Sequence, residues 1–186
     1  MLKFGDTYLN FTNKFLVNWV VPYETPESAE VTIGTQTWMN KNLDIDDGLG
    51  GITTVTQVIG NMTFKFTYYN GEAAIRIASS IQGWRLPTVQ DINDLHEYVV
   101  LQDNKRTIDL RATVSWVEPG SDYYGFHFMG TGYYDNNSVL KQLANDSLFC
   151  TSDIDSNFGA HIFQGFDFRV ITSNKNFKGI IRLIKE

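Results

Sequence analysis

The chain has 186 residues, of which 42% are hydrophobic and 19% charged, a globular composition that excludes long disordered stretches. Its formal charge is −6, and no basic cluster is longer than the pair Lys105-Arg106, which argues against a nucleic-acid partner. A chain of this length suits one ordinary domain with a short appendage, and its 14% aromatic content favours β structure.

The start of the chain resembles neither a signal peptide nor a membrane anchor. Its first 25 residues lack a basic start followed by an uninterrupted apolar stretch, and no run approaches the ~20 apolar residues of a membrane span. We therefore expect no export signal and no membrane insertion. Residues 1–21 alternate short apolar and polar runs, which predicts two or three short strands.

Residues 22–29, "PYETPESA", contain two prolines and two glutamates and predict a linker with a boundary near residue 28. We therefore expect the chain to consist of an anchoring segment with its linker, residues 1–28, and one domain, residues 29–186.

The domain is predicted to begin with β structure. Residues 31–38, "VTIGTQTW", alternate as a strand does, and the segment 45–51 is a polar, glycine-rich loop. Residues 52–70 predict a β-hairpin that turns at Gly60-Asn61.

The apolar pattern then takes a helical period over residues 71–81 and 88–101. Thr88 is a good N-cap for the second helix, with Asp91 three residues later and Pro87 fixing the entry of the chain. Trp84 is predicted to fill the core between both helices and the sheet, so that the Trp84→Ala variant loses several kcal/mol of stability.

Beyond residue 105, short aromatic strands separated by Gly, Asp and Asn are predicted, with at most one helical turn at 138–145. The predicted strands lie in residues 123–135, 147–153, 160–172 and 179–186. The order of strand, two helices and a strand-rich, loop-rich half predicts an α+β fold.

Four phrases in this order resemble the Fibrobacter succinogenes major paralogous domain (FISUMP) family. They are "VTIGTQTWMNKNLD" at 31–44, "YYNGEAAIRIASSIQGWRLPT" at 68–88, "SDYYGFHFMGTGYYD" at 121–135 and "GIIRLIKE" at 179–186. The resemblance covers about residues 31–186. It implies a C-type-lectin-like fold, in which a long loop region of many members binds sugars, proteins or ice.

Two departures from the family pattern concern cysteine. The family's cysteines fall at Ser80 and Leu183 here, so both partners of a plausible disulfide are absent together. That loss, and Cys150 as the single cysteine, fit folding in a reducing compartment. Structural roles are expected for six residues: Trp38, Trp84, Pro87, Thr88, Trp116 and Gly125.

The segment 122–137 mixes aromatic, amide and carboxylate side chains, a combination typical of recognition surfaces. Its candidate ligand-binding residues are Tyr123, Tyr124, Tyr133, Tyr134, Asp135 and Asn136. The alternative is that the alternating aromatics of this segment, such as Phe126 and Phe128, form core strands.

Metal binding and catalysis have weak candidates. Calcium ligands are conceivable at Asp153, Asp155 and Asn157, or at Asp44, Asp46 and Asp47, but neither loop completes an EF-hand. The three histidines, His96, His127 and His161, lack metal-ligand spacing, no Ser, His and Asp set stands out, and Cys150 resembles a buried strand residue. We expect no cofactor and no enzymatic activity.

These features together suggest a recognition or decoration module of a phage virion, such as a head fibre, capsid decoration or tail-associated protein. Residues 1–24 would join it to other virion proteins, the lectin-like domain would bind a host surface glycan or protein, and the chain would form a homo-oligomer. The alternatives are a purely structural virion subunit that binds no external ligand and a Bacteroidetes cell-surface protein whose export signal has been removed.

Overall fold

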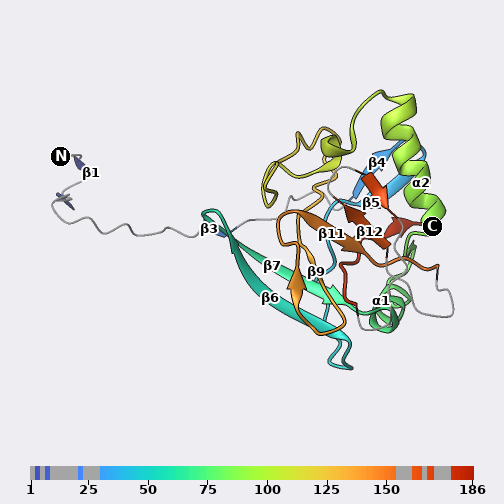
Figure 1. Ribbon diagram of the computed structural model, residues 1–186, viewed down its shortest axis with the longest axis horizontal. Helices are drawn as coiled ribbons and strands as arrows, with labels where there is room; N and C mark the ends of the chain where they lie inside the picture. Colours follow the sequence, from blue (N-terminus) through green and yellow to red (C-terminus); the bar gives the residue numbers. More distant parts are fainter. Residues whose placement is uncertain are drawn as a thin grey trace.

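The computed structural model describes residues 30–153 and 177–186 with their side chains, and outside these ranges the backbone of short strands only. Those strands are β1 (Lys3–Phe4), β2 (Thr7–Tyr8), β3 (Val21–Pro22), β12 (His161–Gln164) and β13 (Asp167–Arg169). The predicted boundary near residue 28 lies outside the described residues. Two helices and several small sheets confirm the α+β prediction (Figure 1).

One sheet brings together segments from the two ends of the domain. Its strand order is β4-β5-β14-β8, with β4 at Glu30–Ile33, β5 at Gln36–Met39, β14 at Ile184–Lys185 and β8 at Trp84–Arg85. Trp38 of β5 lies opposite Ile184 of β14 in an antiparallel pair. The start and the end of the domain therefore lie side by side.

The prediction of a single strand over residues 31–38 was wrong, because the segment folds back as a hairpin. Ile33 pairs with Gln36 across a two-residue turn, and Gly34 takes a φ of 61° there. A Cβ atom at Gly34 would lie 2.8 Å from the Tyr98 ring. Glycine thus permits both the left-handed turn and the close approach of the aromatic ring.

A longer hairpin, β6 (Ile52–Ile59) and β7 (Met62–Tyr69), extends to one side of the molecule (Figure 1). Its strands pair from Ile52 and Tyr69 to Ile59 and Met62, so the predicted Gly60-Asn61 turn is confirmed. Phe64, Phe66 and Tyr68 of β7 are buried. The β3 strand pairs in parallel with β7, and β1 pairs with β2, in agreement with strands predicted near the start of the chain.

The helices are α1 (Gly71–Ala78) and α2 (Val89–Glu97), and α2 continues as a π-helical turn over Tyr98–Gln102. The capping box at α2 is confirmed, since Thr88 Oγ1 accepts from the Asp91 backbone amide and the Asp91 carboxylate accepts from that of Thr88. Arg85 Nη1 and Nη2 also donate to the Asp91 carboxylate, at 2.6 and 2.9 Å. Pro87 is buried immediately before the cap.

The region after α2 is largely irregular. It holds a 3-10 turn (Thr107–Leu110), β9 (Tyr133–Tyr134), β10 (Leu140–Lys141) and β11 (Asp146–Phe149), which pairs with β12. Most of the strand predicted over 123–135 was therefore wrong: only Tyr133 and Tyr134 form a regular strand. Gly125 adopts a φ of 69°, and Asp122 and His127 both have a φ of 50°. Such angles interrupt the pleat that a strand requires.

The larger core cluster joins the strands and helices before residue 103 to the irregular region after α2. Trp38 and Trp116 are 1% and 6% exposed, and the Trp38 ring meets the Phe126 ring edge-on at 5.8 Å. Trp116 Nε1 donates to the Phe128 carbonyl at 2.5 Å. Side chains from β5, β7, α2 and the irregular region therefore share one interior.

A second cluster lies against α1. Cys150 is buried there, and burial raises the pKa of its thiol to about 12. Trp84 packs at the border of this cluster and is only half-buried, with Lys185 Nζ 5.7 Å from its ring centre. Trp84 therefore packs against the cluster at α1, and the prediction that it fills the core between both helices and the sheet was wrong. Among the described residues, no helix has the length and apolar character needed to cross a membrane.

Candidate functional site

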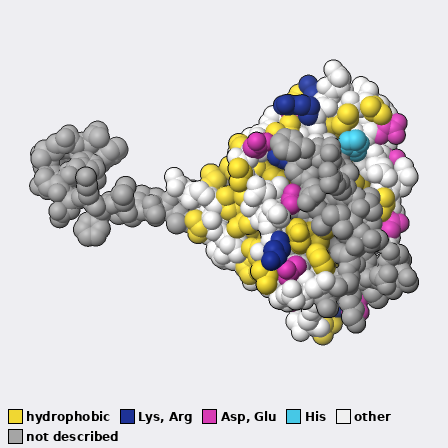
Figure 2. Space-filling model, in the orientation of Figure 1, with side chains coloured by type: hydrophobic (Ala, Val, Ile, Leu, Met, Phe, Trp, Pro, Cys, Tyr) yellow, Lys and Arg dark blue, Asp and Glu magenta, His cyan; other side chains and the backbone are white. Residues whose placement is uncertain are grey.

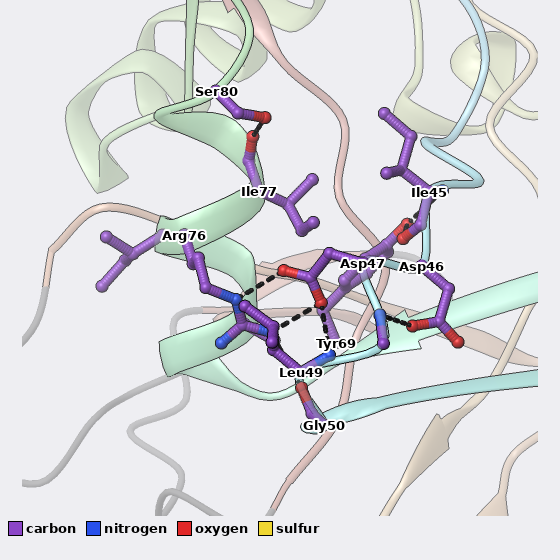
Figure 3. A network of polar contacts seen from close by, with 12 residues as sticks. Ile45, Asp46, Asp47, Leu49, Gly50, Tyr69, Arg76, Ile77 and Ser80 are labelled. Carbon is purple, nitrogen blue, oxygen red and sulfur yellow. Dashed lines mark hydrogen bonds and ion pairs between the residues drawn. The ribbon is translucent and has the colours of Figure 1, made fainter.

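The loop before β6 is fixed to α1 and β7 by its own aspartates and by Tyr69. The Asp47 carboxylate accepts from Arg76 Nε at 2.6 Å and Nη2 at 3.1 Å, as Figure 3 shows, and also from the Leu49 amide. The Tyr69 hydroxyl accepts from the Ile45 amide and donates to its carbonyl, both at 2.9 Å. These contacts hold the chain at residues 45–50 in place.

Asp44 and Asp46 are also engaged within the protein. Asp44 accepts from Lys65 Nζ at 2.6 Å and from Thr67 Oγ1 at 2.5 Å, and Asp46 accepts from the Gly48 amide at 2.9 Å. Within residues 30–153 and 177–186, no group of three or more His, Cys, Asp or Glu is placed to hold a metal ion. The aspartates of this loop therefore act as turn and ion-pair residues.

A cavity of about 460 Å³ opens beside this loop, between the segment 39–45, β7, the segment 127–129 and Arg182. Its wall combines apolar and polar side chains. The apolar residues are Met39, Leu43, Ile45, Phe64, Phe66 and Met129, and the polar ones are Asn40, Lys41, Asn42, Asp44, Lys65, Thr67, His127 and Arg182. This mixture, in a cavity large enough for a small organic ligand, makes it the candidate functional site.

Arg182 is fully buried where three segments meet. Its Nε and Nη2 donate to Asn42 Oδ1 at 3.2 and 2.7 Å, its Nη2 donates to the His127 carbonyl at 3.1 Å, and its Nη1 donates to the Phe126 carbonyl. The guanidinium also lies 4.7 Å from the centre of the Phe126 ring. A buried charge is tolerated only when it is hydrogen-bonded in this way.

Asp122 holds His127 in one orientation. Its Oδ2 lies 2.5 Å from His127 Nδ1, and its Oδ1 accepts from the His127 backbone amide at 2.7 Å. Burial lowers the pKa of His127, and nearby Arg182 lowers it further against the attraction of Asp122. Burial raises the pKa of Asp122, whereas the His127 amide and the charges of His127 and Arg182 lower it. Burial favours the neutral imidazole, and the contact with Asp122 places its proton on Nδ1, which leaves Nε2 as an acceptor.

One polar atom in the cavity wall has no partner. Asn40 is 3% exposed, and its buried Oδ1 accepts no hydrogen bond from the described residues. A buried acceptor without a donor costs about 1–3 kcal/mol. A water or a ligand that supplied the donor would remove this cost.

The six aromatic and polar residues predicted to bind a ligand divide into two groups with different partners. Tyr123 is 59% exposed, its ring meets Tyr124 edge-on at 5.0 Å, and Lys105 Nζ lies 4.1 Å from its centre. Tyr124 donates to Asp103 Oδ2 at 2.5 Å, and the pKa of its phenol is raised, chiefly by burial and also by this carboxylate. Only Tyr123 of this group is exposed.

The second group lies on the β9–β10 hairpin. Tyr134 packs edge-on against Tyr68 at 5.0 Å, and Tyr133 stacks on Phe177 at 5.9 Å. The Asp135 carboxylate accepts from the Val139 and Asn137 amides, both at 2.9 Å, and these bonds lower its pKa. Asp135 therefore closes the turn, while Asn136 is exposed on it.

Asp153, the first of the predicted calcium ligands, has a partner within the protein. Its carboxylate accepts a hydrogen bond from the backbone amide of Val89 at the start of α2. Asp155 and Asn157 lie outside the described residues.

The sequence did not predict the cavity, nor a role in it for Arg182, Asn42 or His127. One signal was present. Arg182 interrupts the apolar run of "GIIRLIKE", and a charge inside a buried strand needs partners from elsewhere in the fold. Those partners, Asn42, Phe126 and His127, lie between 55 and 140 residues away along the chain, so no local pattern identifies them.

Comparisons with models of protein families, with curated proteins and with solved structures find no match to this chain.

Proposed function

We propose that the chain is a non-enzymatic recognition module of a phage virion, with a C-type-lectin-like domain of the FISUMP type that binds its ligand in the cavity beside Arg182. Host surface glycans are the ligand class that the cavity fits best, because carbohydrate sites combine an apolar wall for a sugar face with directional polar groups for its hydroxyls.

The observation that carries the proposal is the meeting of three motif segments at the cavity. Asn42 comes from the phrase at 31–44, Phe126 and His127 from the phrase at 121–135, and Arg182 from the phrase at 179–186. All three phrases resemble the same family. Their convergence on one buried guanidinium supports a shared framework for the loops around the cavity.

The cysteine pattern supports folding before release from a host cell. At the first of the two positions where the family has cysteine, Ser80 donates to the Ile77 carbonyl at 2.7 Å (Figure 3). At the second, Leu183 is fully buried. Neither position requires an oxidising compartment. Attachment to other virion proteins is assigned to residues 1–24, and the assembly is proposed to be a homo-oligomer.

The described part of the surface in Figure 2 bears on the class of ligand. Basic and acidic side chains are interspersed in small groups among hydrophobic ones on that face. Such a surface suits contact with a glycan or a protein better than with a polyanion such as nucleic acid.

The proposal is tested with the full chain carrying a fluorescent label and with Bacteroidetes host cells. Binding should be saturable and should fall at least tenfold after periodate oxidation of the cell-surface glycans. The Ile45→Trp variant should lose binding, because Ile45 is 40% exposed at the cavity and a larger ring there obstructs it.

The matched control is Val117→Trp, which places the same ring at a site that is 69% exposed and outside the cavity. Equal binding by both variants would exclude the cavity. A folded chain that binds no host cell would refute recognition and favour the purely structural virion subunit.

A further inference from the structure

The charges around the cavity are unbalanced in favour of cations. Three lining side chains are basic, Lys41, Lys65 and Arg182, and only Asp44 is acidic. The whole chain has a formal charge of −6. A basic cavity in an acidic protein attracts an anionic ligand and disfavours contact of that ligand with the rest of the surface.

Two of the three cations are already engaged. Lys65 pairs with Asp44 at 2.6 Å, and the Arg182 guanidinium is bound to Asn42 and to the carbonyls of residues 126 and 127. Lys41 is exposed at the cavity and forms no ion pair with the carboxylates of the described residues. Lys41 is therefore the cation with a charge to offer a ligand.

The remaining polar groups suit hydroxyls. His127 Nε2 is an acceptor in the tautomer that Asp122 imposes, and the wall residue Asn40 has an unpartnered Oδ1. Both atoms require a donor, which a sugar hydroxyl supplies and a carboxylate or a phosphate does not. Apolar side chains such as Ile45 and Met129 provide the surface against which the carbon face of a sugar ring packs.

We propose that the ligand of this cavity is a saccharide that carries a carboxylate, with the carboxylate on Lys41 and ring hydroxyls on His127. This inference rests on the proposed function and specifies its ligand class. A single carboxylate matches the one cation that is available. A phosphate, with close to two charges, needs a second cation, and the other two cations of the cavity wall are already engaged.

The test is isothermal titration calorimetry of the full chain with two matched pairs of probes. One pair is sialyllactose and lactose, and the other is trigalacturonate and its methyl ester. At least one acidic probe should bind about tenfold more tightly than its neutral partner, and the difference should shrink as salt is added.

Three variants locate the site. Lys41→Gln should lower the affinity for the acidic probe about tenfold and change the affinity for the neutral probe less than twofold, because the substitution removes only the charge. His127→Asn should lower the affinity for both the acidic and the neutral probe about tenfold. Asparagine is chosen because it tolerates the φ of 50° at this position. Lys105→Gln removes a lysine that lies over Tyr123, outside the cavity, and should change neither.

The outcomes separate this inference from the proposed function. Equal affinity for acidic and neutral probes, with loss in His127→Asn, overturns the acidic class and leaves glycan recognition standing. Loss in Lys105→Gln but not in Lys41→Gln moves the acidic site to the Tyr123 surface and overturns the cavity. Periodate-sensitive binding to cells without binding of any probe overturns the inference alone, whereas failure of both experiments refutes both proposals.

Discussion

Residues 52–97 and residues 104–144 are ordered by different means. The first region is built from a hairpin and two helices, and its only described residues with positive φ are glycines. In the second region, only two two-residue strands and a short 3-10 turn are regular. Every described non-glycine residue with positive φ lies between Asn104 and Ala144.

The second region is held by side chains that bind its backbone. Arg182 binds two of its carbonyls, Trp116 Nε1 binds a third, and Asp122 binds the His127 amide. Backbone polar groups that no regular ladder satisfies need such partners when they are buried. The contrast teaches that regular backbone hydrogen bonding orders the first region, whereas side-chain contacts, among them those of the distant Arg182, order the second.

The largest effect is expected at Trp38, which precedes both regions in the chain and lies in the core cluster that they share. Trp38→Ala should lower the free energy of unfolding by about 4 kcal/mol, because the ring is 1% exposed and packs on Phe126. Trp84→Ala should cost only about 2 kcal/mol, since the half-buried Trp84 leaves a partly open site. Urea denaturation of both variants measures the difference, and equal losses would contradict this reading of the two tryptophans.

The next effect sharpens the contrast between the regions. Arg182→Met should cost about 3 kcal/mol, at about 1 kcal/mol for each of three acceptors left without this donor: Asn42 Oδ1 and the carbonyls of Phe126 and His127. Hydrogen exchange should accelerate at residues 122–128 more than in α1 or α2. Arg182→Lys should not rescue stability, because one ammonium cannot reproduce the planar guanidinium geometry. Uniform acceleration throughout the chain would show that Arg182 stabilises the whole fold and not the second region.

A smaller effect separates two glycine turns with nearly the same φ. Gly34→Ala should cost about 2 kcal/mol, because it combines a φ of 61° with a contact of 2.8 Å to Tyr98. Gly60→Ala, with a φ of 60° and open space around it, should cost about 1 kcal/mol. Thermal unfolding compares the two, and a larger loss at Gly60 would contradict the packing of Tyr98 against the first turn.

The smallest effect is expected in the dependence of stability on acidic pH, through Asp91. Burial tends to raise the pKa of Asp91, but hydrogen bonds from Arg85 and Thr88 outweigh it and lower the pKa below 3.8. The unfolded state therefore binds the proton more readily, and the stabilisation by Asp91 is present above pH 3.8 and lost as the pH falls through the lower folded value. Asp91→Asn should flatten this part of the stability curve, by about 1 kcal/mol or less. An unchanged curve would show that the cap does not titrate in this range.

The same contrast explains which features the sequence could predict. The Gly60-Asn61 turn and the Thr88 capping box are short-range devices, and both were predicted correctly. The turn at Gly34 was missed because the residues on either side alternate as one continuous strand would. Periodicity alone does not reveal a two-residue reversal.

The site was harder to predict because it is assembled from distant segments. Aromatic composition drew attention to Tyr133 and Tyr134, yet their rings pack on Phe177 and Tyr68. The cavity depends instead on Arg182 meeting Asn42 and on Asp122 orienting His127. These are tertiary contacts, and single-residue preferences do not specify them.

The buried thiol of Cys150 has a practical consequence. It is the only cysteine of the chain, it is 2% exposed, and its pKa of about 12 leaves almost no thiolate at neutral pH. A maleimide reagent should therefore react with a cysteine introduced at an exposed position such as Val117 and spare Cys150. The natural chain is thus already a suitable background for attaching one probe at a chosen point on its surface.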